Sequence, residues 1–318
     1  MWDVSLGRVA SLVLRTYPFM LIRAAVYFGI SAAVVVAAGG GAGIGWAFGA
    51  VGGPGARMPG AFWGALAGFA FVVLMLWWLR EYILFLVRAG HVAAFLLTIE
   101  EREPTAAQGQ VGQALALVQQ RFREADTLLA VERCLQGSIA SLVSALDPIG
   151  KFLPAEARVL SKPINTALAA AMGFLADVVL AKPLSTRRGN VWSEARDSIV
   201  LLAQARRVTM TSALQHAAAA WAVTVIVFLL AIAPASAFAQ SHLSGVGPIT
   251  LLFAAVFAWS FKRAIVDPFA IASMMQIYLQ SVAGQRPDPA WDTTLTDASE
   301  DFRELKARAT GSAHARRT

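Results

Sequence analysis

Residues 249–268 read ITLLFAAVFAWSFKRAIVDP, and the interpretation of the whole chain depends on this stretch. It is apolar up to Phe261, after which Lys262, Arg263 and Asp267 follow in quick succession before Pro268. A helix of roughly 20 apolar residues crosses a bilayer, and a charge at its centre costs about 3 kcal/mol or more unless it faces a partner or water. The stretch therefore either ends a span at Phe261, with two basic anchors beyond it, or carries ionisable groups at depth.

The composition is typical of an integral membrane protein. Hydrophobic residues make up 57% of the 318 residues and charged residues 15%, and the mean hydropathy is +0.58, well outside the usual composition of a soluble domain. The net charge is +7. Because the basic residues are interspersed with apolar ones, we expect anionic lipid headgroups, and not nucleic acid, as their partners. A single cysteine, Cys134, excludes an intrachain disulfide and a thiol cluster for metal.

Four apolar runs are candidate spans: residues 19–38, 61–79, 214–232 and 249–261, the last reaching 272 if the charges lie at depth. Lys and Arg concentrate between the second and third runs and near both termini, so the positive-inside rule places these parts in the cytoplasm of a bacterial inner membrane. The sequence thus predicts an all-α polytopic helical membrane protein with about four transmembrane helices as two hairpins, plus long amphipathic cytoplasmic or interfacial helices. The predicted organisation is an interfacial N-terminal helix (1–18), a first hairpin (19–79), an amphipathic region (80–213), a second hairpin (214–283) and a basic cytoplasmic tail (284–318).

Two parts of the amphipathic region stand out. A T-x-x-Q capping box at residues 105–108 precedes apolar residues that recur in steps of four and three over residues 111–149, which predicts one long amphipathic helix with a coiled-coil-like seam. Residues 164–181 are nearly long enough to span but contain Asn165 and Asp177. We interpret them as interfacial or re-entrant.

Four glycines have a regular spacing in the first connector. Gly41, Gly45, Gly49 and Gly53 stand four residues apart, the small-xxx-small spacing that lets helix backbones approach closely in lipid. This spacing indicates a helix-packing or oligomer contact. A flexible external connector is the other interpretation, because Pro54 follows directly.

Asp267 is the leading candidate for a charged site on a transport path. Arg263 precedes it by one helical turn, and Pro268 releases backbone carbonyls nearby. The positive-inside pattern places Lys262 and Arg263 near the cytoplasmic face, so we expect Asp267 at the inner mouth of the span, where the chain bends at Pro268. Glu81 and Asp177 are second-rank candidates.

The sequence carries no motif for enzymatic chemistry. The four histidines are scattered without metal-ligand spacing, and no phosphate-binding loop, dinucleotide fingerprint or nucleophile elbow occurs. We therefore expect no catalytic residues, no metal and no cofactor.

Two short strings resemble the C-terminal half of the choline transporter-like family. They are ARDSIVLL at residues 195–202 and AIVDPFA at residues 264–270, the second of which places Asp267 where the family has its aspartate. The resemblance covers residues 196–230 and 261–284. Family members have more spans, cysteine-rich external loops and a Val-Asp-Thr triplet, whereas this chain has one cysteine and Pro268 after the aspartate. The resemblance implies a related C-terminal module, assembled as an oligomer.

Two functions follow as expectations. The first is a transporter or channel-like permeation path for a small polar or cationic solute, formed by a homo-oligomer. The alternative is a membrane-anchored scaffold or assembly factor, whose working surface would be the amphipathic seam of residues 111–149.

Overall fold

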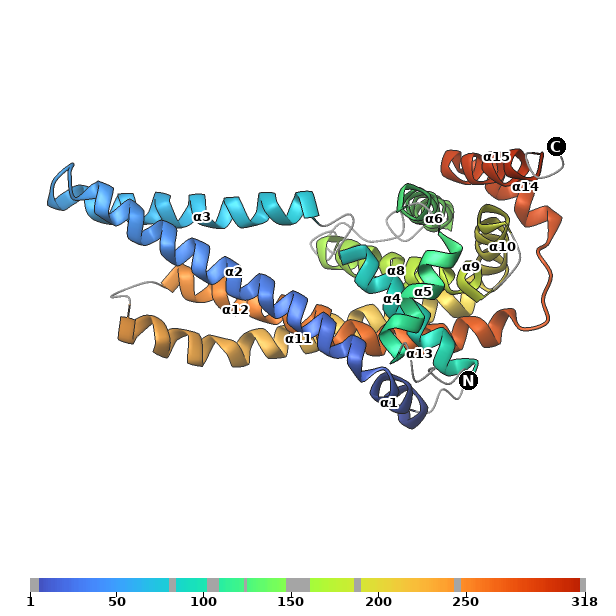
Figure 1. Cartoon of the computed structure of the whole chain (residues 1–318), viewed down its shortest axis with the longest axis horizontal. Helices are drawn as coiled ribbons and strands as arrows, with labels where there is room; N and C mark the ends of the chain where they lie inside the picture. The colour runs from blue at the N-terminus through green and yellow to red at the C-terminus, as the bar shows by residue number, and fades with distance from the viewer. Residues whose placement is uncertain are drawn as a thin grey trace. The chain divides into compact units, whose positions relative to one another are not determined.

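The computed structural model describes residues 6–79, 84–101, 109–122, 125–146, 161–185, 190–242 and 247–314 (Figure 1). The elements within these ranges are all helical, which confirms the predicted all-α class. The chain divides into two compact units. Unit 1 comprises Met1–Phe19, Val87–Trp221 and Asp267–Thr318, and unit 2 comprises Met20–Leu86 and Ala222–Val266.

Unit 2 consists of long apolar helices. They are α2 (Tyr17–Gly49), α3 (Arg57–Leu79), α11 (Arg206–His242) and α12 (Gly247–Phe261), of which α2 and α11 begin in unit 1. A 3-10 turn η1 (Pro54–Ala56) joins α2 to α3, and a π-helical turn η4 (Lys262–Val266) follows α12. The charged interruption after Phe261 is therefore helical.

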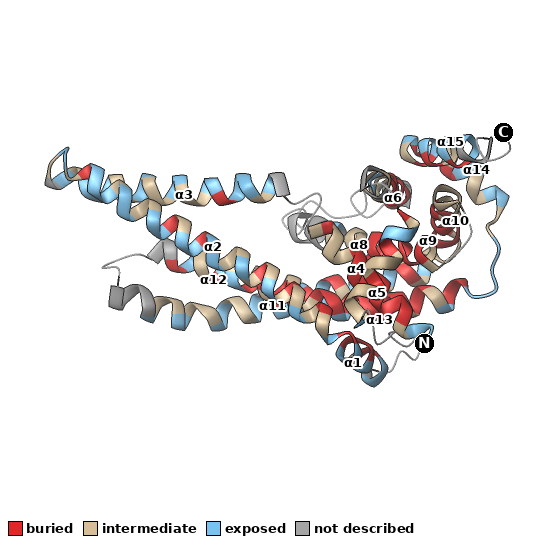
Figure 2. Ribbon diagram, viewed as in Figure 1, coloured by how far each residue is buried: buried red, intermediate tan, exposed pale blue. Residues whose placement is uncertain are grey.

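Within the described ranges, three helical segments are long and apolar enough to cross a membrane: Tyr17–Gly52, Arg57–Trp77 and Arg206–Ala237. At 15 residues, α12 is shorter than these. The side chains of α3 and of the unit 2 part of α11 are mostly exposed or half-buried, as the pale blue and tan ribbon of Figure 2 shows. Large apolar side chains such as Trp63, Phe71, Trp77 and Leu230 are among the exposed ones. An aqueous surface rarely carries so many contiguous apolar groups, whereas a lipid-facing one does.

Unit 1 is a helical domain with a dense apolar core. Its helices are α1 (Leu6–Arg15), α4 (Phe85–Ile99), α5 (Gly109–Arg121), α6 (Ala125–Leu146), α8 (Ser161–Val179), α9 (Ala181–Ser185), α10 (Val191–Gln204), α13 (Asp267–Val282), α14 (Pro289–Ala298) and α15 (Glu300–His314). The middle of α4, residues 89–97, and residues 199–203 of α10 are almost wholly buried. The helix α8 packs against α6 and α13, and α1 packs against α13.

The predicted single long helix over residues 111–149 is wrong. The structure has two helices, α5 and α6, which pack against different partners, α5 against α9 and α6 against α8, α10 and α15. The seam residues Leu135, Ile139 and Leu142 are buried in this core. The capping box at 105–108 and the helix stop at 147–148 lie outside the described residues.

The ambiguous residues 164–181 belong to α8 and the start of α9 in unit 1. Phe174, Leu175 and Val178 are buried, in a helix that packs against α6 and α13. Residues 174–181 of this segment therefore belong to the core of unit 1.

The C-terminal residues, predicted to be a basic tail, fold into α14 and α15. Asp288 caps α14 by accepting from the Ala290 N–H, and Pro289 takes the first helical position. Phe302 and Leu305 of α15 are fully buried, and this helix packs against α6 and α10. The apolar stripe of α15 is narrow within a polar sequence, which is why the composition alone suggested a solvated segment.

Candidate functional site

The candidate site is the seam where α2 and α12 face each other in unit 2. Ser31 and Ser260 share a hydrogen bond of 2.7 Å between their hydroxyls. The Tyr27 ring meets Trp259 edge-on at 5.7 Å, and the Phe28 ring lies 5.6 Å from that of Phe257. Residues of α2 spaced three and four apart share one helix face, so the seam follows directly from the 3.6-residue period.

Arg23 is the most deeply buried charge in the seam. It is 1% exposed, and its Nε and Nη2 donate to the backbone carbonyl of Arg263 at 3.2 and 2.9 Å. Its Cζ also lies 5.9 Å from the centroid of the Tyr27 ring. Burying a guanidinium is costly unless its donors are satisfied, and a charged donor makes a stronger bond to a carbonyl than a neutral one.

The carbonyl that Arg23 binds lies in the π-helical turn η4. In a π-helical ladder the carbonyl of residue i accepts from the N–H of residue i+5. For Arg263 this residue is Pro268, which has no N–H. The Arg23 guanidinium supplies two donors to this carbonyl from the neighbouring helix α2.

In the predicted charged cluster Lys262 and Asp267 are buried, whereas Arg263 is half-buried. Lys262 is 4% exposed and Asp267 is 1% exposed, whereas a basic anchor in the headgroups would extend from the surface. Arg263 places its Cζ 6.0 Å from the centroid of the Trp259 ring. Asp267 is the first residue of α13, and Pro268 lies in the first turn, where a helix tolerates proline. At this point the π-helical turn η4 gives way to the α-helix α13.

Arg23 is absent from the residues that the sequence pattern singled out. The signal was present, because a charged residue inside the predicted span 19–38 is by itself a candidate functional group. The stretch 249–268 drew attention because it held several charges, whereas Arg23 stood alone.

The glycine spacing of α2 lies at its contact with α3, and Figure 1 shows the two helices close together near the turn that joins them. A Cβ added to Gly41 or Gly45 would overlap the backbone carbonyl of Gly64 or Gly60, and one on Gly49 would stand 2.5 Å from the carbonyl oxygen of Ala56. The contact is antiparallel, since residue numbers rise along α2 as they fall along α3. Such close approach permits Cα–H···O contacts between the helices.

Gly53 and a second glycine repeat, on α3, complete this picture. Gly53 has φ 98° and lies in the turn before η1, a conformation that glycine adopts without strain. The partner motif on α3, with Gly60, Gly64 and Gly68 also four apart, is readable in the sequence but was not singled out. Two matching glycine repeats in neighbouring apolar runs favour a contact within one hairpin.

The second-rank acidic candidates do not belong to the seam. Asp177 lies in unit 1, where it accepts from Nη1 of Arg88 at 3.4 Å, while Nη2 of the same arginine donates to Glu132 at 2.8 Å. This triad joins α4, α6 and α8. Glu81 lies outside the described residues.

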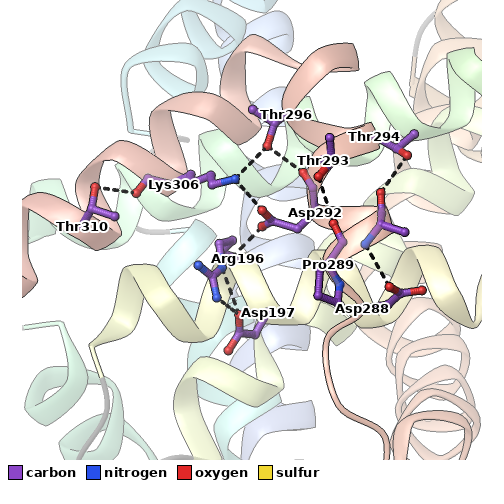
Figure 3. Close-up of polar contacts among 11 residues, drawn as sticks. Arg196, Asp197, Asp288, Pro289, Asp292, Thr293, Thr294, Thr296, Lys306 and Thr310 are labelled. Carbon is purple, nitrogen blue, oxygen red and sulfur yellow. Dashed lines mark hydrogen bonds and ion pairs between the residues drawn. The ribbon is translucent and has the colours of Figure 1, made fainter.

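A polar network fixes α14 and α15 on α10 (Figure 3). Lys306 of α15 donates to a carboxylate oxygen of Asp292 and to the Thr296 hydroxyl, at 3.2 Å in the latter case. Arg196 of α10 lies 3.7 Å from the other oxygen of Asp292 and pairs with Asp197 at 2.6 Å. The network holds the C-terminal helices to the core of unit 1.

Cys134 lies beside two acidic residues of α15. Its Sγ and the carboxylate oxygens of Asp301 and Glu304 lie within 4.8 Å of one another. Burial, with a smaller effect from the two carboxylates, raises the pKa of the Cys134 thiol from 9.0 to about 11. Because a thiol binds metal as the thiolate, and because Glu304 already pairs with Arg308 at 2.6 Å, we interpret this group as a packing contact of α15 on α6.

A serine and a histidine of unit 1 form a bond between α11 and α13. Nδ1 of His216 lies 2.7 Å from the Ser212 carbonyl, which can only accept, so this nitrogen carries a proton. In the neutral ring Nε2 then accepts from the Ser273 hydroxyl at 2.8 Å. Ser273 is 8% exposed within a helix, so the pair serves as a hydrogen bond between helices.

Comparison of the chain with protein-family models, with characterised proteins and with solved structures finds no match. The function is therefore inferred from the chemistry of the seam itself.

Proposed function

We propose that the chain is a multi-pass membrane protein whose α2–α12 seam lines a permeation path for a small polar solute. In this proposal unit 2 crosses the bilayer as two hairpins, α2 with α3 and α11 with α12, and the N- and C-termini are cytoplasmic. The observation that carries the proposal is the burial of Arg23 on an apolar helix, bonded to the carbonyl of Arg263 in a π-helical turn.

A charge and a π-helical turn at one place are unusual for a helix that only anchors a protein. An ionisable group within a span costs free energy and marks a solute or ion path by default, and π-helical turns occur frequently at functional sites. The hydroxyls of Ser31 and Ser260 continue the polar character one to two turns further along the same face.

The path requires more than one copy of the chain. Four helices alone rarely enclose a path, and the unit 2 helices expose large apolar side chains that lipid or a second copy would cover. A homo-oligomer is therefore part of the proposal. The resemblance of residues 264–270 to the choline transporter-like family supports a transport role for the same segment.

The alternative of a membrane-anchored scaffold is less well supported. Its working surface would be the seam of residues 111–149, yet Leu135, Ile139 and Leu142 are buried in unit 1. The helices α8, α10 and α15 already pack against α6. A partner would have to displace part of this core before it could bind.

Tracer efflux from proteoliposomes tests the transport proposal. Vesicles hold labelled choline, glycine and chloride, and we expect at least one tracer to leave faster than from protein-free vesicles. The variant Arg23→Met removes the donors of the seam and should reduce that efflux to the protein-free rate. Arg57→Met is the matched control, because Arg57 lies in the same unit over the Trp46 ring, with its Cζ 4.8 Å from the centroid.

Two results would contradict the proposal. One is that wild-type protein releases none of the tracers faster than empty vesicles, and the other is that Arg23→Met releases them as fast as wild type. Arg23→Lys, which keeps the charge but not the two-nitrogen geometry, covers the case in which Arg23→Met fails to fold. We expect it to retain part of the efflux.

A further inference from the structure

We infer that the solute of this path is a small anion and not a cation, an inference that rests on the proposed path along α2 and α12. The charges of unit 2 carry it. Among the described residues of this unit the charged side chains are Arg23, Arg57, Lys262 and Arg263, all of them basic. Glu81, its one acidic residue by sequence, lies outside the described residues.

The basic groups are concentrated at the seam and two of them are buried. Arg23 is 1% exposed and Lys262 is 4% exposed, while Arg263 contributes the carbonyl that Arg23 binds. Asp267 follows η4 directly in the chain and brings one negative charge. Even with Asp267 counted, three positive charges stand against one negative charge, so the positive potential does not depend on any of these groups lacking a partner.

A positive potential in a medium of low dielectric constant selects the sign of the solute. Buried charges are poorly screened by salt, so they repel a cation and attract an anion over several ångströms. Basic side chains line anion and phosphate pores, whereas acidic side chains line cation pores. The hydroxyls of Ser31 and Ser260 bond to each other in the same seam and add no charge to this potential.

This inference opposes the cationic solute that was one expectation from the sequence. A choline-like cation needs aromatic faces or carboxylates around it. Two aromatic rings of the seam instead lie near arginines, with the Arg23 Cζ 5.9 Å from the centroid of the Tyr27 ring and the Arg263 Cζ 6.0 Å from that of the Trp259 ring. The basic charges of the seam are therefore stronger evidence about the sign of the solute than the resemblance of the short string AIVDPFA.

The test uses the full chain in proteoliposomes loaded with labelled chloride, acetate and choline, with the membrane potential clamped by potassium and valinomycin. We expect chloride or acetate to leave at least about tenfold faster than choline. Arg23→Gln and Lys262→Gln should each reduce this ratio severalfold, and Arg57→Gln should leave it unchanged. Variants are compared at matched helicity and matched elution from a size-exclusion column.

The outcomes separate this inference from the proposed path. If choline leaves as fast as the anions or faster, the anion inference is overturned while the path stands. If no tracer leaves faster than from protein-free vesicles, the path itself is contradicted and the inference falls with it. If the anion preference persists unchanged in both Gln variants, the seam is not the origin of the selectivity and the inference is overturned as well.

Discussion

The guanidinium of Arg23 donates two hydrogen bonds, at 3.2 and 2.9 Å, to the backbone carbonyl of Arg263, 240 residues further along the chain. The bond joins the start of one apolar helix to the π-helical turn that follows another. Pro268, five residues after Arg263, has no backbone N–H that could donate to this carbonyl in a π-helical pattern. The packing of α2 against η4 and the proposed path both involve the Arg23 guanidinium and the Arg263 carbonyl.

The α2–α3 contact predicts opposite outcomes for two neighbouring glycines. Gly45→Ala should destabilise the hairpin by roughly 1–3 kcal/mol, because the new methyl group overlaps the Gly60 carbonyl. Gly43→Ala should be neutral or stabilising by up to about 1 kcal/mol, because a Cβ there meets nothing within 4 Å and alanine favours the helix. Denaturant titration in detergent measures both, and equal losses at the two positions would show that the helices do not approach at Gly45.

Removing the cation of the Arg88 triad should lower the stability of the protein, whereas removing an exposed arginine elsewhere should not. Arg88→Met leaves Asp177 and Glu132, whose side chains are 9% and 14% exposed, without this cation. The expected loss in the free energy of unfolding is roughly 1–3 kcal/mol, reduced from the value for a fully buried pair because Arg88 itself is 23% exposed. Arg303→Met, at an exposed arginine of α15, is the control and should change the stability by less than about 0.5 kcal/mol. A loss of the same size in both variants would contradict the claim that the triad stabilises the fold.

The thiol of Cys134 should be nearly inert in the folded protein. Because burial raises its pKa from 9.0 to about 11, the thiolate fraction at pH 8 falls roughly 100-fold, and alkylation by iodoacetamide should slow by at least that factor relative to unfolded chain. The raised pKa also means that this group stabilises the fold below pH 9 and that the contribution is lost as the pH rises toward 11. Asp301→Asn with Glu304→Gln should speed the alkylation, and a rate in native protein that matches unfolded protein would contradict the burial of the thiol.

Much of the architecture was predictable because it depends on local periodicity and charge. The apolar runs over residues 19–38, 61–79 and 214–232 each fall within a helix that is long enough to cross a membrane. The regular spacing of Gly41, Gly45 and Gly49 pointed to close packing, and the structure places these glycines against α3.

The parts that sequence did not predict depend on contacts between distant segments. The apolar residues of α6 form part of the core of unit 1, because α8, α10 and α15 pack against this helix. A local sequence pattern shows that a helix has an apolar face, but not which other helix will pack against that face. The bond between Arg23 and Arg263 is of the same kind. A π-helical turn has no compositional signature. In the sequence, the only pointers to this contact are the lone Arg23 within the predicted span 19–38 and Pro268 after the apolar run 249–261.

The docking of α15 predicts a large effect of its buried aromatic residue. Phe302→Ala should cost about 3–5 kcal/mol, since Phe302 is fully buried where α15 packs against α6 and α10. Hydrogen exchange should rise in α15 and along the α6 residues beneath it. Arg303→Ala is the neighbouring control, and unchanged exchange in the Phe302 variant would mean that α15 does not depend on this contact.

The most direct measurement of the central claim is a double-mutant cycle between Arg23 and Pro268. Arg23→Met alone should destabilise the protein, because it removes two charged donors from the Arg263 carbonyl. Pro268→Ala restores a backbone N–H, so the same Arg23→Met substitution should cost roughly 1–3 kcal/mol less in that background. If the two substitutions are additive within about 0.5 kcal/mol, Arg23 does not compensate for Pro268, and the account of the seam is contradicted.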